Sequence, residues 1–248
     1  MNTALPIYII KAGSTFPENV AQTGDFEDWL IAGLGLPKTD VRGDVQVIDA
    51  REGGELPKPS KCAGVVISGA HAMITDELPW MRRLVDWTAQ LVAAQVPFLG
   101  ICFGHQVLAW AMGGKVDFHP QGREIGSVEI VLNGNAKDDP LFATLPKQFR
   151  AHAVHAQSVR KLPKDATLLA GNAFEPTHAF RIGGCAWGIQ FHPEFNVARM
   201  QVYLDHFSPT LQAAGQDEAA IRAGLVETPE SASVLPRFVR LARAQVFE

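Results

Sequence analysis

Short apolar runs alternate along the chain with segments in which apolar residues recur at helical spacing. The apolar runs of the first half predict strands at residues 7–10, 44–50, 63–70 and 96–101. Between the last two runs, the spacing of one helix face is formed by Trp80, Leu84, Trp87 and Leu91. Further helices are predicted at 24–35, which ends at a glycine, and at 103–112. Strands that alternate with helices in this way are typical of a parallel sheet covered by helices.

The second half of the chain has a more β-rich pattern and then turns helical. Strands are predicted at 127–132, 166–171 and 185–191. After Phe195 the pattern is helical, with interruptions predicted at "SPT" (208–210) and "ETPESAS" (227–233). We therefore expect residues 1–248 to form a single flavodoxin-like three-layer α/β/α domain with a mainly parallel central sheet. A helical C-terminal extension is expected from about residue 197.

Composition and charge exclude several classes of function. The net charge is −4 and no cluster of Lys and Arg occurs, so we expect no nucleic-acid partner. The apolar stretch near the N-terminus lacks the features of a signal peptide, and no run is long enough to suggest a membrane partner. The cysteines Cys62, Cys102 and Cys185 are odd in number and scattered, which argues against a disulfide framework and favours a cytoplasmic protein. Cys62 and Cys185 lie on apolar strands, where we expect them to be packing residues.

One cysteine has an unusual setting. In "GICFG", residues 100–104, Cys102 lies where an apolar run passes into a helical pattern. A strand-to-helix turn presents one side chain at the carboxyl edge of a parallel sheet, where ligands bind. Gly100 and Gly104 remove the Cβ atoms that would collide in so tight a bend, as in a nucleophile elbow, and the helix N-terminus favours a thiolate. The alternative is a small apolar residue packed at a strand end, and the pattern alone leaves both open.

The segment "GIQFHPEF", residues 188–195, supplies groups that a cysteine nucleophile needs. An imidazole holds the proton of such a nucleophile and passes it to the leaving group, which His192 could do. Glu194 could fix the tautomer of that ring and stabilise the imidazolium. His192 by itself has the alternative of an ordinary surface or core histidine, so the hypothesis depends on both segments together.

The two segments resemble a known pair of signatures. "GICFGHQ" and "QFHPE" resemble the nucleophile and His–Glu motifs of class I, triad-type, glutamine amidotransferases. "VVISGAHAMITDELPWMRRL" and "HAVHAQSVRKLPKDATLLA" resemble further tracts of stand-alone members related to the amidotransferase domain of GMP synthetase. The resemblance implies hydrolysis of the glutamine side-chain amide. Cys102 would form a glutamyl thioester, and His192 would protonate the departing ammonia and then activate the water that releases glutamate.

Stabilising the tetrahedral oxyanion requires two hydrogen-bond donors. The backbone N–H of Phe103, at the start of the helix after Cys102, is expected to be one of them. The resemblance implies that the other lies in "SGA", at Gly69 or Ala70. Many relatives have a second glycine where this chain has Ala70, so the resemblance leaves the choice of amide open.

The resemblance also implies contacts to the substrate. Gln106, four residues after the nucleophile, matches a family position that contacts the substrate amide, whereas a helix-surface glutamine is the alternative. His155, Gln157 and Ser158 lie in a tract that resembles the substrate side of the family's site. Gln157 stands where the family pattern His-x-Asp-x-Val has aspartate, which affects recognition of the α-amino group.

Three alternatives differ in function from a glutamine amidotransferase. A γ-glutamyl peptidase or hydrolase would apply the same chemistry to a γ-glutamyl peptide or amine. A catalytically silent regulatory subunit would keep only the fold, but all three triad positions are intact. An α/β-hydrolase takes its acid from a segment between nucleophile and histidine, whereas Glu194 follows His192.

The sequence gives no reason to expect a cofactor or a metal. "HAVH", residues 152–155, has no further ligand at metal-binding spacing, and no phosphate-binding or dinucleotide motif occurs. The residues after Glu194 are too few for an ATP-using synthase domain. Released ammonia is therefore expected to go to water or to a separate synthase subunit.

Overall fold

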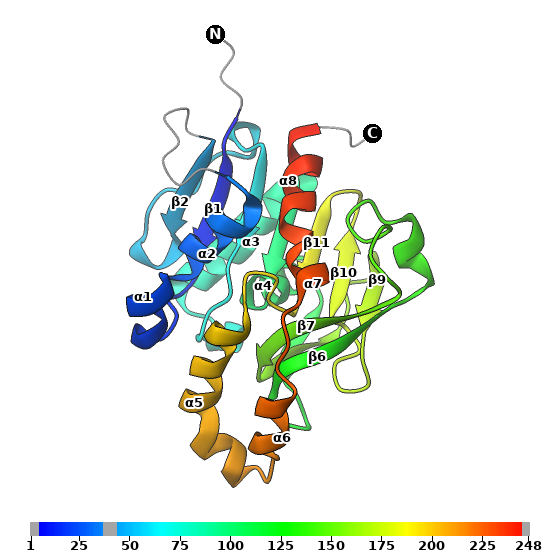
Figure 1. The fold of residues 1–248 in the computed structure, drawn as a ribbon. Helices are drawn as coiled ribbons and strands as arrows, with labels where there is room; N and C mark the ends of the chain where they lie inside the picture. Colours follow the sequence, from blue (N-terminus) through cyan, green and yellow to red (C-terminus); the bar gives the residue numbers. More distant parts are fainter. Residues whose placement is uncertain (1–4, 37–43, 245–248) are drawn as a thin grey trace.

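Figure 1 shows the fold in a computed structural model, which describes residues 5–36 and 44–244. Its strands are β1 (Ile7–Lys11), β2 (Val45–Asp49), β3 (Gly64–Ile67), β4 (Phe98–Ile101), β5 (Lys115–Phe118), β6 (Glu124–Leu132), β7 (Gln148–His155), β8 (Gln157–Lys161), β9 (Ala166–Gly171), β10 (Ala179–Ile182) and β11 (Ala186–Ile189). Nine of them form one sheet in the order β2-β1-β3-β4-β11-β10-β9-β6-β7, while β5 and β8 pair separately. The neighbours from β2 to β11 are parallel, and those from β11 to β7 are antiparallel.

Helices cover both faces of this sheet (Figure 1). The α-helices of the described residues are α1 (Pro17–Thr23), α2 (Phe26–Leu34), α3 (Pro79–Ala93), α4 (Phe103–Ala111), α5 (Val197–Ala213), α6 (Glu218–Ala223), α7 (Pro229–Ala232) and α8 (Val234–Ala244). None of the helices in the described ranges has the length and apolarity needed to cross a membrane.

Alternate residues of the strands feed two hydrophobic cores. On β1, Ile7 and Ile9 pack with side chains of α2 and α8, whereas Tyr8 and Ile10 pack with side chains of α3 and α4. This follows from the two-residue period of a strand, which sends successive side chains to opposite faces. The predicted α/β fold with a mainly parallel central sheet is confirmed, and antiparallel strands extend the sheet on one side.

The helix predicted at 24–35 illustrates how local sequence sets its bounds. α2 begins after Asp25, whose side chain accepts a hydrogen bond from the N–H of Phe26 and whose own N–H donates to Asp28. It ends at Gly35, where φ is 70°, a conformation that favours glycine. The short helix α1 just before it was not predicted.

Two details of the predicted organisation are wrong. The helix α5 runs through the predicted interruption at 208–210 and contains Pro209. Proline lacks the N–H that would complete the helical hydrogen bond, but Leu204 and Leu211 on either side are buried, and their packing keeps the helix continuous. Cys62 and Cys185 are buried as expected, although each precedes a strand and does not lie within it.

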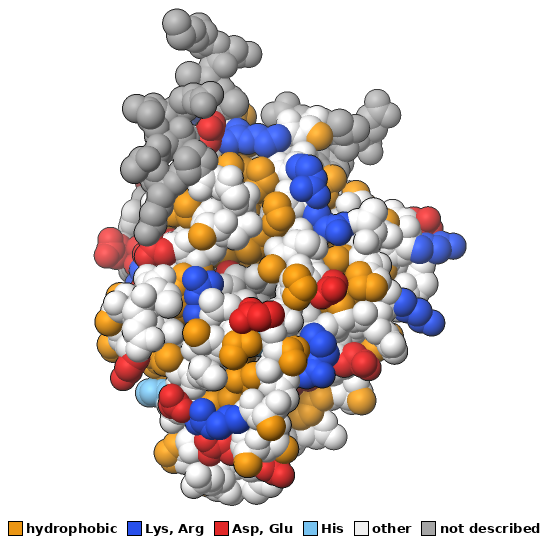
Figure 2. Space-filling view, in the orientation of Figure 1, with side chains coloured by type: hydrophobic (Ala, Val, Ile, Leu, Met, Phe, Trp, Pro, Cys, Tyr) orange, Lys and Arg blue, Asp and Glu red, His pale blue; other side chains and the backbone are white. Residues whose placement is uncertain are grey.

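The C-terminal helices pack against one edge and one face of the sheet. In Figure 1, α5 lies beyond the lower edge of the sheet, toward which β1 runs, and α8 returns along one face. On the face drawn in Figure 2, Lys and Arg side chains are interspersed with Asp and Glu and form no patch of one sign.

The turn between β4 and α4 is unusually tight. A Cβ atom on Gly100 would lie 2.2 Å from the carbonyl oxygen of Gly104. A Cβ atom on Gly104 would in turn lie 2.6 Å from the carbonyl oxygen of Ile67 on β3. These neighbours are backbone atoms, which cannot move aside as a flexible side chain can, so both glycines are required for the close approach.

Gly100→Ala is therefore expected to lower the free energy of unfolding by about 3 kcal/mol, the upper part of the range for overpacked cores. Urea denaturation of the purified variants measures this difference. Gly134→Ala is the matched control, because a Cβ atom there meets nothing within 4 Å, and its change should stay within about 1 kcal/mol. Equal midpoints for the two variants would contradict the packing argument.

Candidate active site

Cys102 lies at the end of β4 in a strained backbone conformation. Its φ is 48° and its ψ is −95°, a sparsely populated region for a residue with a side chain. Such a conformation costs about 1–3 kcal/mol and is concentrated at functional sites. The side chain is buried at the N-terminus of α4, and Sγ lies 3.8 Å from the carbonyl oxygen of Val154. The backbone thus makes a tight, strained turn at Cys102, between β4 and α4.

His192 and Glu194 are paired, as the sequence predicts. Nδ1 of His192 lies 2.7 Å from Oε1 of Glu194, and both side chains are buried. The segment is fixed to β7 by a hydrogen bond of 2.8 Å from the N–H of His192 to the carbonyl of His152. A carboxylate at Nδ1 leaves Nε2 for chemistry, as in a nucleophile–histidine–acid triad.

Gly69 shows that the two predicted segments meet. A Cβ atom on Gly69 would lie 2.9 Å from Cε1 of His192 and 3.7 Å from Cβ of Cys102. Only a residue without a side chain fits between these groups, so the loop after β3, the elbow and the histidine are in mutual contact.

The charge state of His192 follows from its neighbours. Burial alone would lower the pKa of His192, but the negative charge of Glu194 and the interaction with Cys102 outweigh it and raise the pKa to about 10. The ring is therefore protonated at neutral pH. An imidazolium in this position can give a proton to a leaving group.

The backbone of the loop after β3 is held in one orientation. The hydroxyl of Ser68 donates to the carbonyl of Gly69 at 2.9 Å and accepts from the N–H of Ala12 at 3.0 Å. Because a trans peptide directs its C=O and N–H to opposite sides, the N–H of Ala70 points away from Ser68. Among the described residues, neither this N–H nor that of Phe103 has a hydrogen-bond partner.

A cavity of about 280 Å³ opens at Cys102. The residues predicted for the site that line it are Ala70, Cys102, Phe103, Gln106, His155, Gln157 and His192. Glu194 lies behind His192, and Gly69 packs against the ring of that histidine. Ser158 is buried outside the lining, where its hydroxyl faces the carboxylate of Glu175.

Hydrogen bonds fix the side chains of Gln106 and Gln157 in the cavity wall. Nε2 of Gln106 donates to the backbone carbonyl of Gln157 at 3.0 Å and to Oε1 of Gln190 at 3.2 Å. The side chain of Gln157 donates through Nε2 to the hydroxyl of Thr75 at 2.6 Å, and its buried Oε1 has no hydrogen-bond partner among the residues that the structure describes. A buried oxygen without a partner can accept a hydrogen bond from a ligand.

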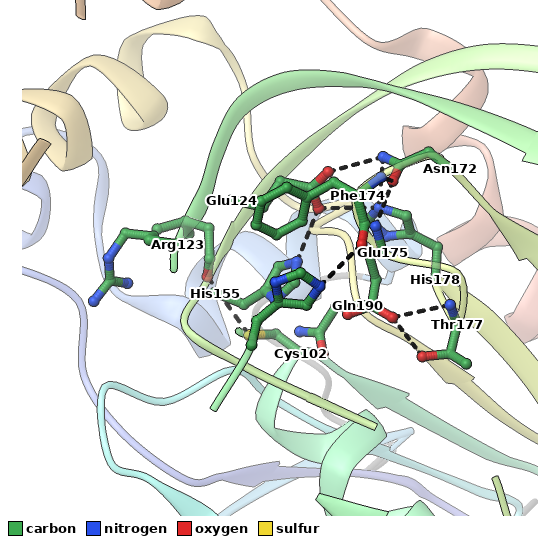
Figure 3. Close-up of polar contacts among 12 residues, drawn as sticks. Cys102, Arg123, Glu124, His155, Asn172, Phe174, Glu175, Thr177, His178 and Gln190 are labelled. Carbon is green, nitrogen blue, oxygen red and sulfur yellow. Dashed lines mark hydrogen bonds and ion pairs between the residues drawn. The ribbon is translucent and has the colours of Figure 1, made fainter. Parts of the chain in front are cut away.

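His155 belongs to a buried polar network (Figure 3). Its Nε2 lies 2.9 Å from Glu124, which also contacts His178 at 3.1 Å and accepts from Asn172 at 2.8 Å. Burial would raise the pKa of Glu124, but hydrogen bonds from His155 and His178 hold the pKa well below its usual value. Since Nδ1 of His155 contacts the carbonyl of Gln157 at 3.0 Å, both ring nitrogens are used in positioning the cavity wall.

The opposite wall was missed in the sequence. It includes Tyr203 of α5, whose hydroxyl lies 3.0 Å from Nε2 of His71 and 3.1 Å from Oγ1 of Thr15. Arg123 and Phe207 also line the cavity. The helical pattern after Phe195 could show that α5 has a buried face, but nothing local indicates which element that face covers.

Comparison with known sequences shows which family the chain resembles. The profile of the family described as "Glutamine amidotransferase class-I" matches residues 38–208. The chain is 33% identical over 148 residues to Gamma-glutamyl peptidase 4 of Arabidopsis thaliana, a match that covers 58% of this chain and 59% of the relative. It is also 33% identical over 148 residues to the glutamine-hydrolyzing GMP synthase of Aeropyrum pernix, covering 57% of this chain but 25% of that relative. The chain thus matches less than two thirds of the length of either protein.

Solved structures show the same fold over nearly the whole chain. A glutamine amidotransferase from Methylobacillus flagellatus superposes with a TM-score of 0.74 at 23% identity, covering 96% of this chain and 95% of that one. A glutamine amidotransferase from Thermotoga maritima superposes with a TM-score of 0.72 at 19% identity, covering 98% and 99%. These likenesses establish the fold, and the family profile over most of the sequence establishes the lineage. The chain belongs to the class I glutamine amidotransferase family.

Proposed function

We propose that the protein hydrolyses the amide bond of a γ-glutamyl substrate through a glutamyl thioester on Cys102. One observation carries this proposal: a cysteine on a strained turn is buried beside a histidine whose ring a carboxylate holds, at the wall of a cavity. Cys102 is the nucleophile, His192 the proton donor and acceptor, and Glu194 the group that orients the ring. No cofactor is needed for this reaction.

The acylation step begins with the Cys102 thiolate and the His192 imidazolium. Sulfur attacks the δ-carbonyl carbon of the glutamyl group, and the carbonyl electrons move to oxygen. As the tetrahedral intermediate collapses, the C–N bond breaks and His192 gives its proton to the departing nitrogen, which leaves as ammonia or an amine. The products of this step are the thioester and a neutral imidazole.

The deacylation step reverses these roles. Neutral His192 takes a proton from water while the hydroxide attacks the thioester carbon. Collapse of the second intermediate breaks the C–S bond and releases glutamate, and the thiolate–imidazolium pair is restored. The N–H groups of Phe103 and Ala70, which have no partner among the described residues, are the donors we assign to the oxyanion. Gly69 leaves the space in which the ring of His192 lies close to Cys102.

Polar groups along the cavity are assigned to the substrate's amino-acid end. Gln106 holds the wall segment in register through its bond to the backbone of Gln157. The unpartnered Oε1 of Gln157 is the acceptor for the α-ammonium group, a neutral replacement for the family's aspartate. His155 supports this wall from behind through its contact with Glu124. Ser158 is buried next to Gln157 in the same strand, β8.

Two substrate classes fit the same chemistry. A glutamine amidotransferase passes ammonia to an acceptor, which here would be on a separate synthase subunit. A γ-glutamyl peptidase releases an amine or peptide to water, and the match to the Arabidopsis γ-glutamyl peptidase covers a larger share of that relative than of the GMP synthase. A cavity of about 280 Å³ leaves room for a leaving group larger than ammonia.

Cys102→Ser is expected to abolish release of glutamate from every γ-glutamyl substrate, because a hydroxyl is far less nucleophilic than a thiolate at neutral pH. Cys62→Ser and Cys185→Ser are the controls, and both should keep most of the activity. Burial raises the pKa of Cys62 to about 11, so that thiol is not activated. A glutamine-derived affinity label that alkylates either control cysteine in the parent protein would refute the assignment of Cys102. If the parent protein turned over none of the substrates, it would be a catalytically silent subunit.

Glu194→Gln is expected to move the alkaline limb of the kcat/KM profile to lower pH. The imidazolium of His192 is the active form, so activity falls as pH rises through its pKa of about 10. The carboxylate raises that pKa, and its removal should lower the limb by about one pH unit or more. The rate should fall less than in His192→Ala, since Glu194 transfers no proton. An unchanged limb, or equal losses in the two variants, would argue for a different role.

Free glutamine is expected to be a poor substrate for the chain by itself. The neutral Gln157 attracts the α-ammonium group less strongly than a carboxylate would. In this assay the chain is tested without an added synthase subunit. Steady-state assays on glutamine and γ-glutamyl-methylamide measure this, and a hydrolase should prefer the methylamide. Hydrolysis of glutamine alone at an ordinary enzymatic rate, about 10 per second, would show that the site is neither gated by a partner nor diverted to another amide.

A further inference from the structure

Arg123 lines the cavity with Cys102, and the proposed mechanism gives it no part. It directly precedes β6, and in Figure 3 its side chain extends away from the network around Glu124. Its guanidinium carbon lies 3.9 Å from the centre of the Phe207 ring on α5. This cation–π contact holds the charged group in place at the cavity wall.

The charge of Arg123 has no acidic partner in the described part of the chain. No carboxylate forms an ion pair with it, and its Nε is buried without a hydrogen bond. Lys11, by contrast, contacts both Asp25 and Glu27 at 2.7 Å. Burial lowers the pKa of Arg123 and the Cys102 thiol opposes this, but a guanidinium remains charged at neutral pH. A partly buried cation without a partner is unfavourable until an anion joins it.

The rest of the cavity lining supplies no carboxylate, and the Cys102 thiolate of the proposed mechanism is already paired with the imidazolium of His192. No Asp or Glu is among the residues that line it. His71, on the same wall, has its pKa lowered to about 4 by burial and by His206, His192 and Arg123, so it is neutral at neutral pH. The cavity is therefore suited to a ligand with negative charge.

The contact with Phe207 leaves the N–H groups of Arg123 available to a ligand. The aromatic ring accepts no conventional hydrogen bond from the guanidinium, and none of the described residues accepts one from its N–H groups. Two parallel N–H bonds from a guanidinium match the two oxygens of a carboxylate. The contact with Phe207 thus fixes the side chain of Arg123 and leaves its N–H groups for a ligand.

We infer that Arg123 is a specificity-determining residue that binds a carboxylate of the substrate. This rests on the proposed function only in taking the substrate to be a γ-glutamyl compound. The carboxylate has two sources, the α-carboxylate of the glutamyl group or an acid group on the leaving amine. In the second case, γ-glutamyl amino acids and peptides are the substrate class, because glutamine has no such group.

Kinetics on three substrates test the assignment and identify the source. Arg123→Gln should lower kcat/KM for γ-glutamylglycine by about 10- to 100-fold, mainly through KM, as loss of a charged hydrogen-bonded pair predicts. If the loss disappears with γ-glutamyl-methylamide, Arg123 binds the acid group of the leaving amine. If the loss persists there and disappears with the α-carboxamide of γ-glutamylglycine, Arg123 binds the α-carboxylate. Unchanged kcat/KM on all three substrates would overturn the assignment.

Two further variants control for charge and folding. Arg82→Gln removes an exposed arginine that pairs with Glu77, and it should leave every kcat/KM unchanged. Arg123→Lys keeps the charge but loses the paired N–H geometry, so its loss should be smaller and again confined to KM. If Arg123→Gln does not fold, as judged by circular dichroism, Arg123→Lys carries the same test.

Calorimetry separates this inference from the proposed reaction. In the Cys102→Ser background, the dissociation constant of γ-glutamylglycine should rise by the same factor when Arg123 is replaced by Gln. A parent protein that hydrolyses none of the substrates, yet binds γ-glutamylglycine through Arg123, would reject the proposed function and keep this assignment. Binding that is equally strong with Gln at position 123 would reject the assignment whatever the activity.

Discussion

The parallel pairing of β4 with β11 is the constraint on which the site depends. Ile101 is in register with Ile189, and the N–H of Cys102 donates to the carbonyl of Ile189 at 2.8 Å. The ends of β4 and β11 are therefore at the same edge of the sheet, although most of the antiparallel strands lie between them in the sequence. His192, three residues beyond Ile189, reaches Cys102 because the strands are neighbours and run the same way.

The close approach of backbone at that edge then selects the residues around it. Gly100 and Gly104 let the helix α4 begin directly against β3, and Cys102 absorbs the strain in its φ of 48°. Gly69 leaves space for the ring of His192. The helix α5, which follows Glu194 almost immediately, closes the other side of the cavity with aromatic residues and holds Arg123 in place through Phe207. One edge of the sheet thus carries the turn at Cys102, the contact between His192 and Glu194, and the walls of the cavity.

Features with local determinants could be read from the sequence. The glycines of the elbow and the two-residue spacing of His192 and Glu194 are visible in short motifs, and so are the alternating strands and helices of the parallel half. Strands β7 and β8 were missed because buried polar residues interrupt the apolar alternation, such as His152 in β7 and Ser158 in β8. Arg123 was missed because its importance comes from α5, which lies far away in the sequence and packs beside it only after folding.

The central claim is that a glutamyl group becomes bonded to Cys102 during turnover. Intact-protein mass spectrometry after rapid acid quenching of a γ-glutamyl-methylamide reaction measures this directly. The account predicts a mass increase equal to one glutamyl group, located by peptide mapping on residue 102 and lost again when the substrate is exhausted. Release of glutamate with no covalent species, or with the adduct on Cys62 or Cys185, would contradict it.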